Sequence, residues 1–114
     1  MSQIIVFVRT KFVGFHRWKD APEVVSFLRN WHRHIFHVKI GVEVEGNNRE
    51  VEFFIFQKQV EGYLDLKYAD QQFESSCEMI AQDLLDHFRA TYCEVSEDGE
   101  NGAHVFAPFY TART

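Results

Sequence analysis

Three histidines have the residue type and the spacing of a metal centre: His16 stands alone, and His32 and His34 form a His-x-His pair. The pair opens an apolar, β-branched run that ends near Val44. Side chains at i and i+2 of a strand point to the same face, so a strand here would aim both imidazoles into one space. His16, at the end of a neighbouring strand, would complete a three-histidine face. Zinc held by three histidines keeps its fourth position open for water or substrate, so the sequence predicts a zinc pocket.

The elements that must position these histidines follow from periodicity and turn chemistry. Residues 3–12 and 34–45 are rich in Val, Ile and Phe and predict two strands. Asp20, followed by Pro22, predicts the N-cap of a short helix between them. Residues 50–56 resemble a third strand-like segment, which a short helix over 57–64 would follow.

The second half shows the clearest periodicity. Apolar residues from Phe73 to Phe88 fall at helical spacing and predict an amphipathic helix over about 71–90, although Ser75 and Ser76 could instead mark its start. Residues 91–96 and 103–109 are typical of a hairpin. We therefore expect one α+β domain over residues 1–114, an antiparallel four-stranded sheet with two helices on one face, in the order ββααββ.

Composition narrows the class of protein. The net charge is −5, yet residues 1–41 hold seven Lys and Arg against Asp20 and Glu23, while residues 42–114 hold five basic and fifteen acidic residues. Residues 1–41 are positively charged and carry the histidines, which suits an anionic ligand. Alternatively, the positive and negative parts of the chain simply complement each other across the fold or between subunits. A nucleic-acid partner is disfavoured because such proteins are more often basic overall. Without a membrane-length apolar run, a signal peptide or a CxxC motif, we expect a cytoplasmic protein with reduced thiols.

The histidine motif resembles the zinc site of the 6-pyruvoyl-tetrahydropterin synthase and 6-carboxy-tetrahydropterin synthase superfamily. Phe15-His16 and His32-Arg33-His34 stand in that family's order, with Arg33 in place of its usual glycine. The resemblance implies that the three histidines bind Zn2+. It also implies the tunnelling fold, with subunits assembled into rings and the pocket between subunits. The family usually anchors a pterin or purine-like ring with a glutamate, a role that falls on Glu97 in Val95-Ser96-Glu97.

Other landmarks of the family are kept or lost. Lys58 matches a family lysine and is a candidate ligand-binding residue, as is Arg33, which could hold a phosphate. The synthases use a cysteine general base and an Asp-His proton relay. Leu28 and Leu66 stand at the cysteine and histidine positions, and neither leucine can exchange a proton. Asp65 is kept and is the candidate catalytic residue.

These observations predict a zinc-dependent, 6-pyruvoyl-tetrahydropterin synthase-like protein that binds or acts on a pterin or purine-like, possibly phosphorylated, small molecule. If it is an enzyme, the resemblance implies a lyase. The alternative is a non-catalytic binder that sequesters or senses a guanine-like nucleotide, and a third possibility is a structural oligomer whose histidines bind nothing. Twelve phenylalanines in so short a chain favour a homo-oligomer, since aromatic residues concentrate at subunit interfaces.

Overall fold

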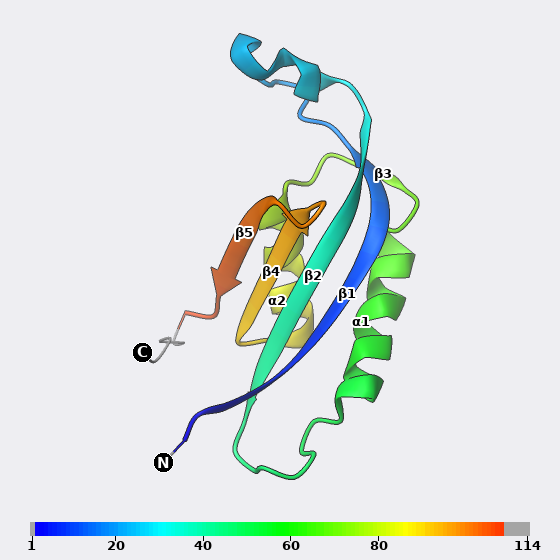
Figure 1. Ribbon diagram of the computed structural model, residues 1–114. Helices are drawn as coiled ribbons and strands as arrows, with labels where there is room; N and C mark the ends of the chain where they lie inside the picture. The colour runs from blue at the N-terminus through cyan, green and yellow to red at the C-terminus, as the bar shows by residue number, and fades with distance from the viewer. Residues whose placement is uncertain (1, 109–114) are drawn as a thin grey trace.

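The computed structural model describes residues 2–108 as an α+β protein with a curled five-stranded sheet of order β3-β1-β2-β4-β5 (Figure 1). Helices α1 and α2 lie together on one face of this sheet, and no helix among residues 2–108 covers the other face. Along the chain the elements are β1 (Ile4–His16), the 3-10 helix η1 (Glu23–Arg29), β2 (His32–Val44), α1 (Phe53–Lys67), β3 (Gln72–Phe73), α2 (Cys77–Phe88), β4 (Tyr92–Glu97) and β5 (Asn101–Phe106).

The long antiparallel pair of β1 and β2 is the frame of the molecule. Its register runs from Ile4 opposite Val44 to His16 opposite His32. Alternate residues turn to the helices, so Phe12, Phe36 and Ile40 are buried. Both helices complete this core with their apolar faces, through Phe56, Val60 and Leu64 of α1 and Cys77, Ile80, Ala81, Leu84 and Leu85 of α2.

Local capping decides where the helices begin. The Ser76 side chain accepts a hydrogen bond from the Met79 N–H, so α2 starts at Cys77, which agrees with the alternative start and not with residue 71. The Glu52 carboxylate accepts the N–H groups of Phe54 and Ile55 in the same way. The prediction of a strand-like segment over 50–56 is therefore wrong, because this cap turns Phe53 and its successors into the first turn of α1.

The expected tunnelling-fold sheet, four antiparallel strands in the order ββααββ, is also wrong. The sheet has five strands and is mixed, because β3 lies parallel to the end of β1, with Phe15 opposite Gln72 and His16 opposite Phe73. A third helical element, η1, separates β1 from β2. A two-residue strand carries no periodic signal, and it forms here because the chain between α1 and α2 passes beside β1.

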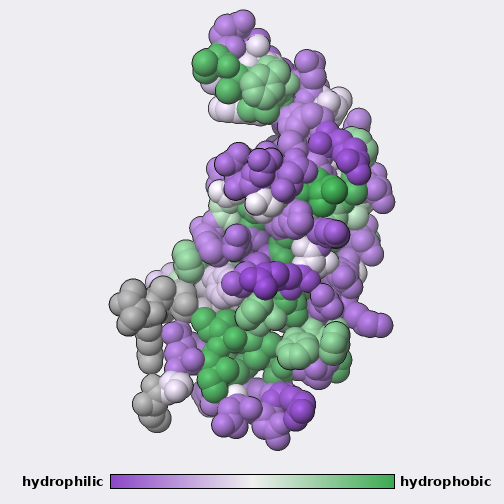
Figure 2. All heavy atoms as spheres, in the orientation of Figure 1, coloured by the Kyte–Doolittle hydropathy of each residue, from purple (hydrophilic) through white to green (hydrophobic). Residues whose placement is uncertain are grey.

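The segment between β1 and β2 does not form the expected helix capped by Asp20. Pro22 takes the N-cap position without a side-chain hydrogen bond, and Val25 has non-helical backbone angles. The segment projects beyond the helices that build the core (Figure 1). Its apolar side chains therefore stay at the surface, with Val24 87% and Phe27 68% exposed. Figure 2 shows a small hydrophobic group at this end of the molecule, apart from the larger hydrophobic area near the other end.

A polar cluster fastens α1 to α2 behind the sheet. The Asp83 carboxylate accepts hydrogen bonds from Tyr63 (2.8 Å), Tyr68 (2.5 Å) and Lys67 (2.8 Å). Burial alone would raise the pKa of Asp83, but the hydrogen bonds from Lys67, Tyr68 and Tyr63 outweigh it and lower the pKa. The ionised carboxylate therefore stabilises the fold.

We expect Asp83→Ala to lower the free energy of unfolding by about 1–3 kcal/mol, because it leaves the buried Tyr68 hydroxyl without its acceptor. Urea unfolding followed by circular dichroism measures this loss. Asp86→Ala is the control, since Asp86 is exposed and its carboxylate accepts from Gln82 alone among the hydrogen bonds of the described chain. Because the folded pKa is lowered, the contribution of Asp83 is present above the unfolded value near pH 4 and is lost as pH falls through the folded pKa. Equal losses in both variants would contradict this role.

Candidate metal centre

The two long strands bring the three histidines together at one end of the sheet. His16 ends β1, His32 begins β2 directly opposite, and His34 follows on the same face of β2. One ring nitrogen from each histidine lies within 4.8 Å of the others. The sequence prediction that these side chains share one space is confirmed, and the group could hold a metal ion.

Each imidazole is oriented through its Nδ1 atom. His16 Nδ1 lies 3.1 Å from the Ser75 carbonyl oxygen, and His32 Nδ1 lies 2.8 Å from the Asn30 carbonyl oxygen. His34 Nδ1 lies 2.7 Å from Oδ2 of Asp98. Because all three partners are acceptors, each Nδ1 carries a proton, and in a neutral ring each Nε2 keeps its lone pair. Metal-binding histidines are held in this way by outer carbonyls and carboxylates.

The Nε2 side of the cluster fits a cation. His32 Nε2 is buried and has no hydrogen-bond partner within residues 2–108, a state that costs free energy unless another ligand fills it. Burial lowers the pKa of His16, against the opposing effects of the Ser75 carbonyl and Glu97, and the neighbouring imidazoles lower it further. A neutral imidazole is the form that binds metal. The donor set of three imidazole nitrogens suits zinc, among other transition metals.

Glu97 is the nearest carboxylate to the Nε2 atoms. Its Oε2 lies 2.9 Å from His16 Nε2 and its Oε1 lies 3.6 Å from His34 Nε2. Glu97 pairs with Phe36 across β2 and β4, and Phe36 shares the helix-covered face with His34. Strand register therefore directs this side chain to the histidines. The geometry places one carboxylate beside three imidazole donors.

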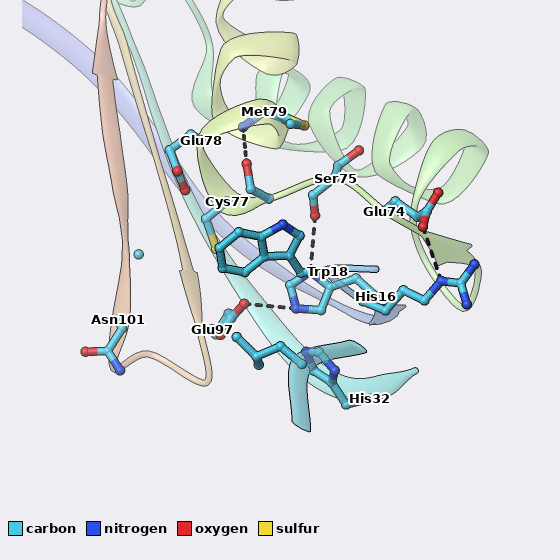
Figure 3. A pocket seen from close by; sticks show the side chains of 14 residues that line it. His16, Trp18, His32, Glu74, Ser75, Cys77, Glu78, Met79, Glu97 and Asn101 are labelled. Carbon is cyan, nitrogen blue, oxygen red and sulfur yellow. Dashed lines mark hydrogen bonds and ion pairs between the residues drawn. The ribbon is translucent and has the colours of Figure 1, made fainter. Parts of the chain in front are cut away.

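A cavity of about 540 Å3 opens beside the histidines (Figure 3). His16, His32 and Glu97 form one side of it, and the start of α2 forms another through Ser75, Ser76 and Cys77. Three apolar side chains also line it, namely Trp18, Leu28 and Met79. A volume in this range accommodates a small organic molecule. Such a molecule would lie against the metal-binding face.

The structure separates the other predicted site residues from this cavity. Arg33 lies between His32 and His34, so strand alternation directs it to the opposite face, where it is exposed. Lys58 is exposed on α1. Asp65 lines a different depression together with Thr10, Lys11 and Glu61. None of the three is among the residues that line the cavity.

The remaining histidines and the cysteines stand apart from the cluster. His37 is exposed on the open face of the sheet, His87 stacks on Tyr63, and His104 pairs with Glu94. Cys77 lines the cavity, but burial, followed by the charges of Glu97 and Glu78, raises its pKa to about 12. Its thiol therefore stays protonated near neutrality, as expected for an inert buried cysteine.

Sequence reasoning missed the outer partners of the histidines, Asn30, Ser75 and Asp98. Two of them act through backbone carbonyls, which leave no trace in the residue type. Asp98 could have been identified from the sequence as a site residue, because it is an acidic turn residue next to Glu97. Its carboxylate also accepts the Ile35 N–H, and this bond, followed by that of His34, lowers its pKa. Asp98 is thus ionised and anchors both the turn and the imidazole.

Comparison with known proteins identifies the fold and leaves the function open. No protein-family model matches the chain, and no curated protein matches it. A solved structure of an uncharacterized protein from Wolinella succinogenes is similar, with a TM-score of 0.77 and 13% sequence identity, covering 93% of this chain and 99% of that one. At this identity the likeness concerns the fold alone. Within residues 2–108, the helices lack the length and apolar character needed to cross a membrane.

We expect about one divalent ion per chain, bound through the histidines. Asp98→Asn should weaken the affinity by about 10–100-fold, the usual effect of losing an outer carboxylate. Competition with a chromophoric chelator measures it for zinc. Glu100→Gln is the matched control, because Glu100 is an exposed acidic residue of the same turn. An unchanged affinity in Asp98→Asn would contradict the orienting role of this carboxylate.

Proposed function

We propose that the protein is a zinc-dependent, 6-pyruvoyl-tetrahydropterin synthase-like protein that acts on or binds a pterin- or purine-like small molecule. The observation that carries the proposal is a cavity of about 540 Å3 bounded by His16, His32 and Glu97. Bound zinc would act as a Lewis acid on oxygen atoms of the ligand. The cavity must also offer contacts to a flat ring.

The cavity walls supply the contacts that such a ring requires. Trp18 presents an indole to the cavity, on which an aromatic ring can stack. A carboxylate can accept two parallel N–H groups of a pterin or guanine, and Glu97, Glu74 and Glu78 all line the cavity. The resemblance assigns this contact to Glu97. These features support a ring with several N–H donors.

The charges around the cavity favour a ligand without phosphate groups. Three carboxylates line it, Glu74, Glu78 and Glu97, and the guanidinium of Arg17 lies 3.2 Å from Glu74. The positive N-terminal end of α2 is already complemented by Ser76 and Glu78. Strand register places Arg9 opposite Lys39 on the other face of the sheet, away from the cavity. We therefore propose an unphosphorylated ligand. The positive charge of residues 1–41 had instead suggested an anionic one.

Binding without turnover is the second candidate, and a specific observation favours it. Leu28 lines the cavity. It stands at the position where the resemblance implies a cysteine that acts as the general base. Cys77 is too weakly acidic to replace it, and Leu66 is 78% exposed on α1. Asp65 would have to act from the neighbouring subunit of an oligomer. A binder that sequesters or senses its ligand needs none of these proton carriers.

Self-association remains part of the proposal. Several large apolar side chains are exposed, including Val24 and Phe27 of η1 and Phe54 and Ile55 at the start of α1. Where such side chains form a contiguous patch, they mark interaction sites. Sedimentation measurements on the purified protein test whether it forms an oligomer.

We expect the zinc-loaded protein to bind reduced neopterin or guanosine, and to bind the triphosphate of each about tenfold more weakly because like charges repel. Isothermal titration calorimetry measures the affinity for each of the four compounds, and His32→Ala should abolish binding. The double variant Glu74→Gln with Glu78→Gln should narrow the difference. Failure of all four compounds would overturn the proposal, whereas tighter binding of the triphosphates would overturn only the choice of an unphosphorylated ligand.

Prolonged incubation separates the two candidates. Chromatography of the ligand after incubation with zinc-loaded protein should recover it unchanged if the protein is a binder. A new product that requires zinc and is absent with His32→Ala would establish an enzyme instead.

A further inference from the structure

When no ligand is bound, the fourth coordination position of the metal centre needs an occupant. Three histidines leave one position of a tetrahedral ion open, and water usually fills it. In this chain a carboxylate lies within 4 Å of two of the histidines. Glu97 Oε2 is 2.9 Å from His16 Nε2, and Glu97 Oε1 is 3.6 Å from His34 Nε2.

These distances suit atoms that share one ion. With bonds of about 2.0–2.2 Å, two ligands of a tetrahedral zinc lie roughly 3.3 Å apart. The two oxygen–nitrogen distances fall on either side of this value. The histidine nitrogens, within 4.8 Å of one another, form a looser group that an ion would draw together.

The hydrogen-bond geometry also suits a cation between Glu97 and the histidines. His16 Nδ1 faces the Ser75 carbonyl and His34 Nδ1 faces Asp98, so each Nε2 presents a lone pair. A carboxylate oxygen is an acceptor as well. Two acceptors at 2.9 Å repel unless a proton or a metal ion lies between them. A metal ion satisfies both oxygens and also the unpartnered His32 Nε2.

We propose that Glu97 is the fourth protein ligand of the metal in the ligand-free protein and that an incoming ligand must displace it. The proposal rests on the metal site of the proposed function but not on the pterin- or purine-like ligand. Strand register fixes the backbone of Glu97 opposite Phe36, while its side chain is 31% exposed toward the cavity. The carboxylate can therefore leave the metal by side-chain rotation alone. Once released, it is free to accept N–H groups of the ligand.

The test uses Co2+ as a spectroscopic probe and azide as a small competing ligand. Wild-type protein, Glu97→Ala and Glu97→Gln are loaded with Co2+ and titrated with azide, and the visible bands of the bound ion report its coordination. We expect the bands of Glu97→Ala to differ from those of wild type, and azide to bind this variant about tenfold more tightly because it displaces only water and not a protein carboxylate. Glu97→Gln keeps the side-chain shape and should change in the same direction.

Loss of a negative charge could by itself favour azide, so Glu78→Gln is the matched control. Glu78 lines the same cavity and also carries one charge, but it is not within contact distance of the histidines among the described ion pairs and hydrogen bonds. We expect it to shift the azide affinity by less than about twofold. Equal shifts in Glu78→Gln and both Glu97 variants, or cobalt bands unchanged by both Glu97 variants, would overturn the proposal. Failure of wild type to bind Co2+ would overturn the metal site of the proposed function together with it.

Discussion

The pairing of β1 with β2 is the constraint on which the site depends. One continuous register sets Phe12 opposite Phe36 in the core and His16 opposite His32 at its end. A slip by one residue would turn every side chain of a strand to the other face, exposing the core phenylalanines and dispersing the histidines. The apolar contacts that fix the sheet against the helices therefore also fix the metal-binding geometry.

The same alternation divides the charges of the first third of the chain. The helix-covered face receives the histidines and the apolar core, while Arg9 and Lys39 lie opposite each other on the open face. Lys39 lies 4.7 Å from the ring centre of Phe7 there. Of the seven Lys and Arg residues in the basic segment, Arg17 alone lines the cavity. A strand has two faces, and its composition describes only their sum.

The start of α2 connects the site to the core. Ser75, just before the helix, orients His16 through its carbonyl oxygen, and Ser76 caps the helix. Cys77 then lies both in the core and at the cavity wall. The adjoining strand β3 is equally tight, since a Cβ on Gly14 would lie 2.7 Å from the Phe73 ring. Packing of α2 and β3 therefore holds the histidine end of β1 in place.

The sequence by itself determined the three histidines, most of the two strands that lead to them and the apolar face of α2, because each depends on spacing within one segment. The predicted strands, 3–12 and 34–45, stopped short of His16 and His32, which the structure includes in β1 and β2. It did not determine β3, which is too short to show a period, or the start of α1, where the Glu52 cap overrides a strand-like composition. It also did not place Asp65 and Lys58 away from the cavity or turn Glu97 onto His16 and His34. Only the tertiary structure decided these, because distances between segments far apart in the chain are set by packing and register, not by local residue patterns.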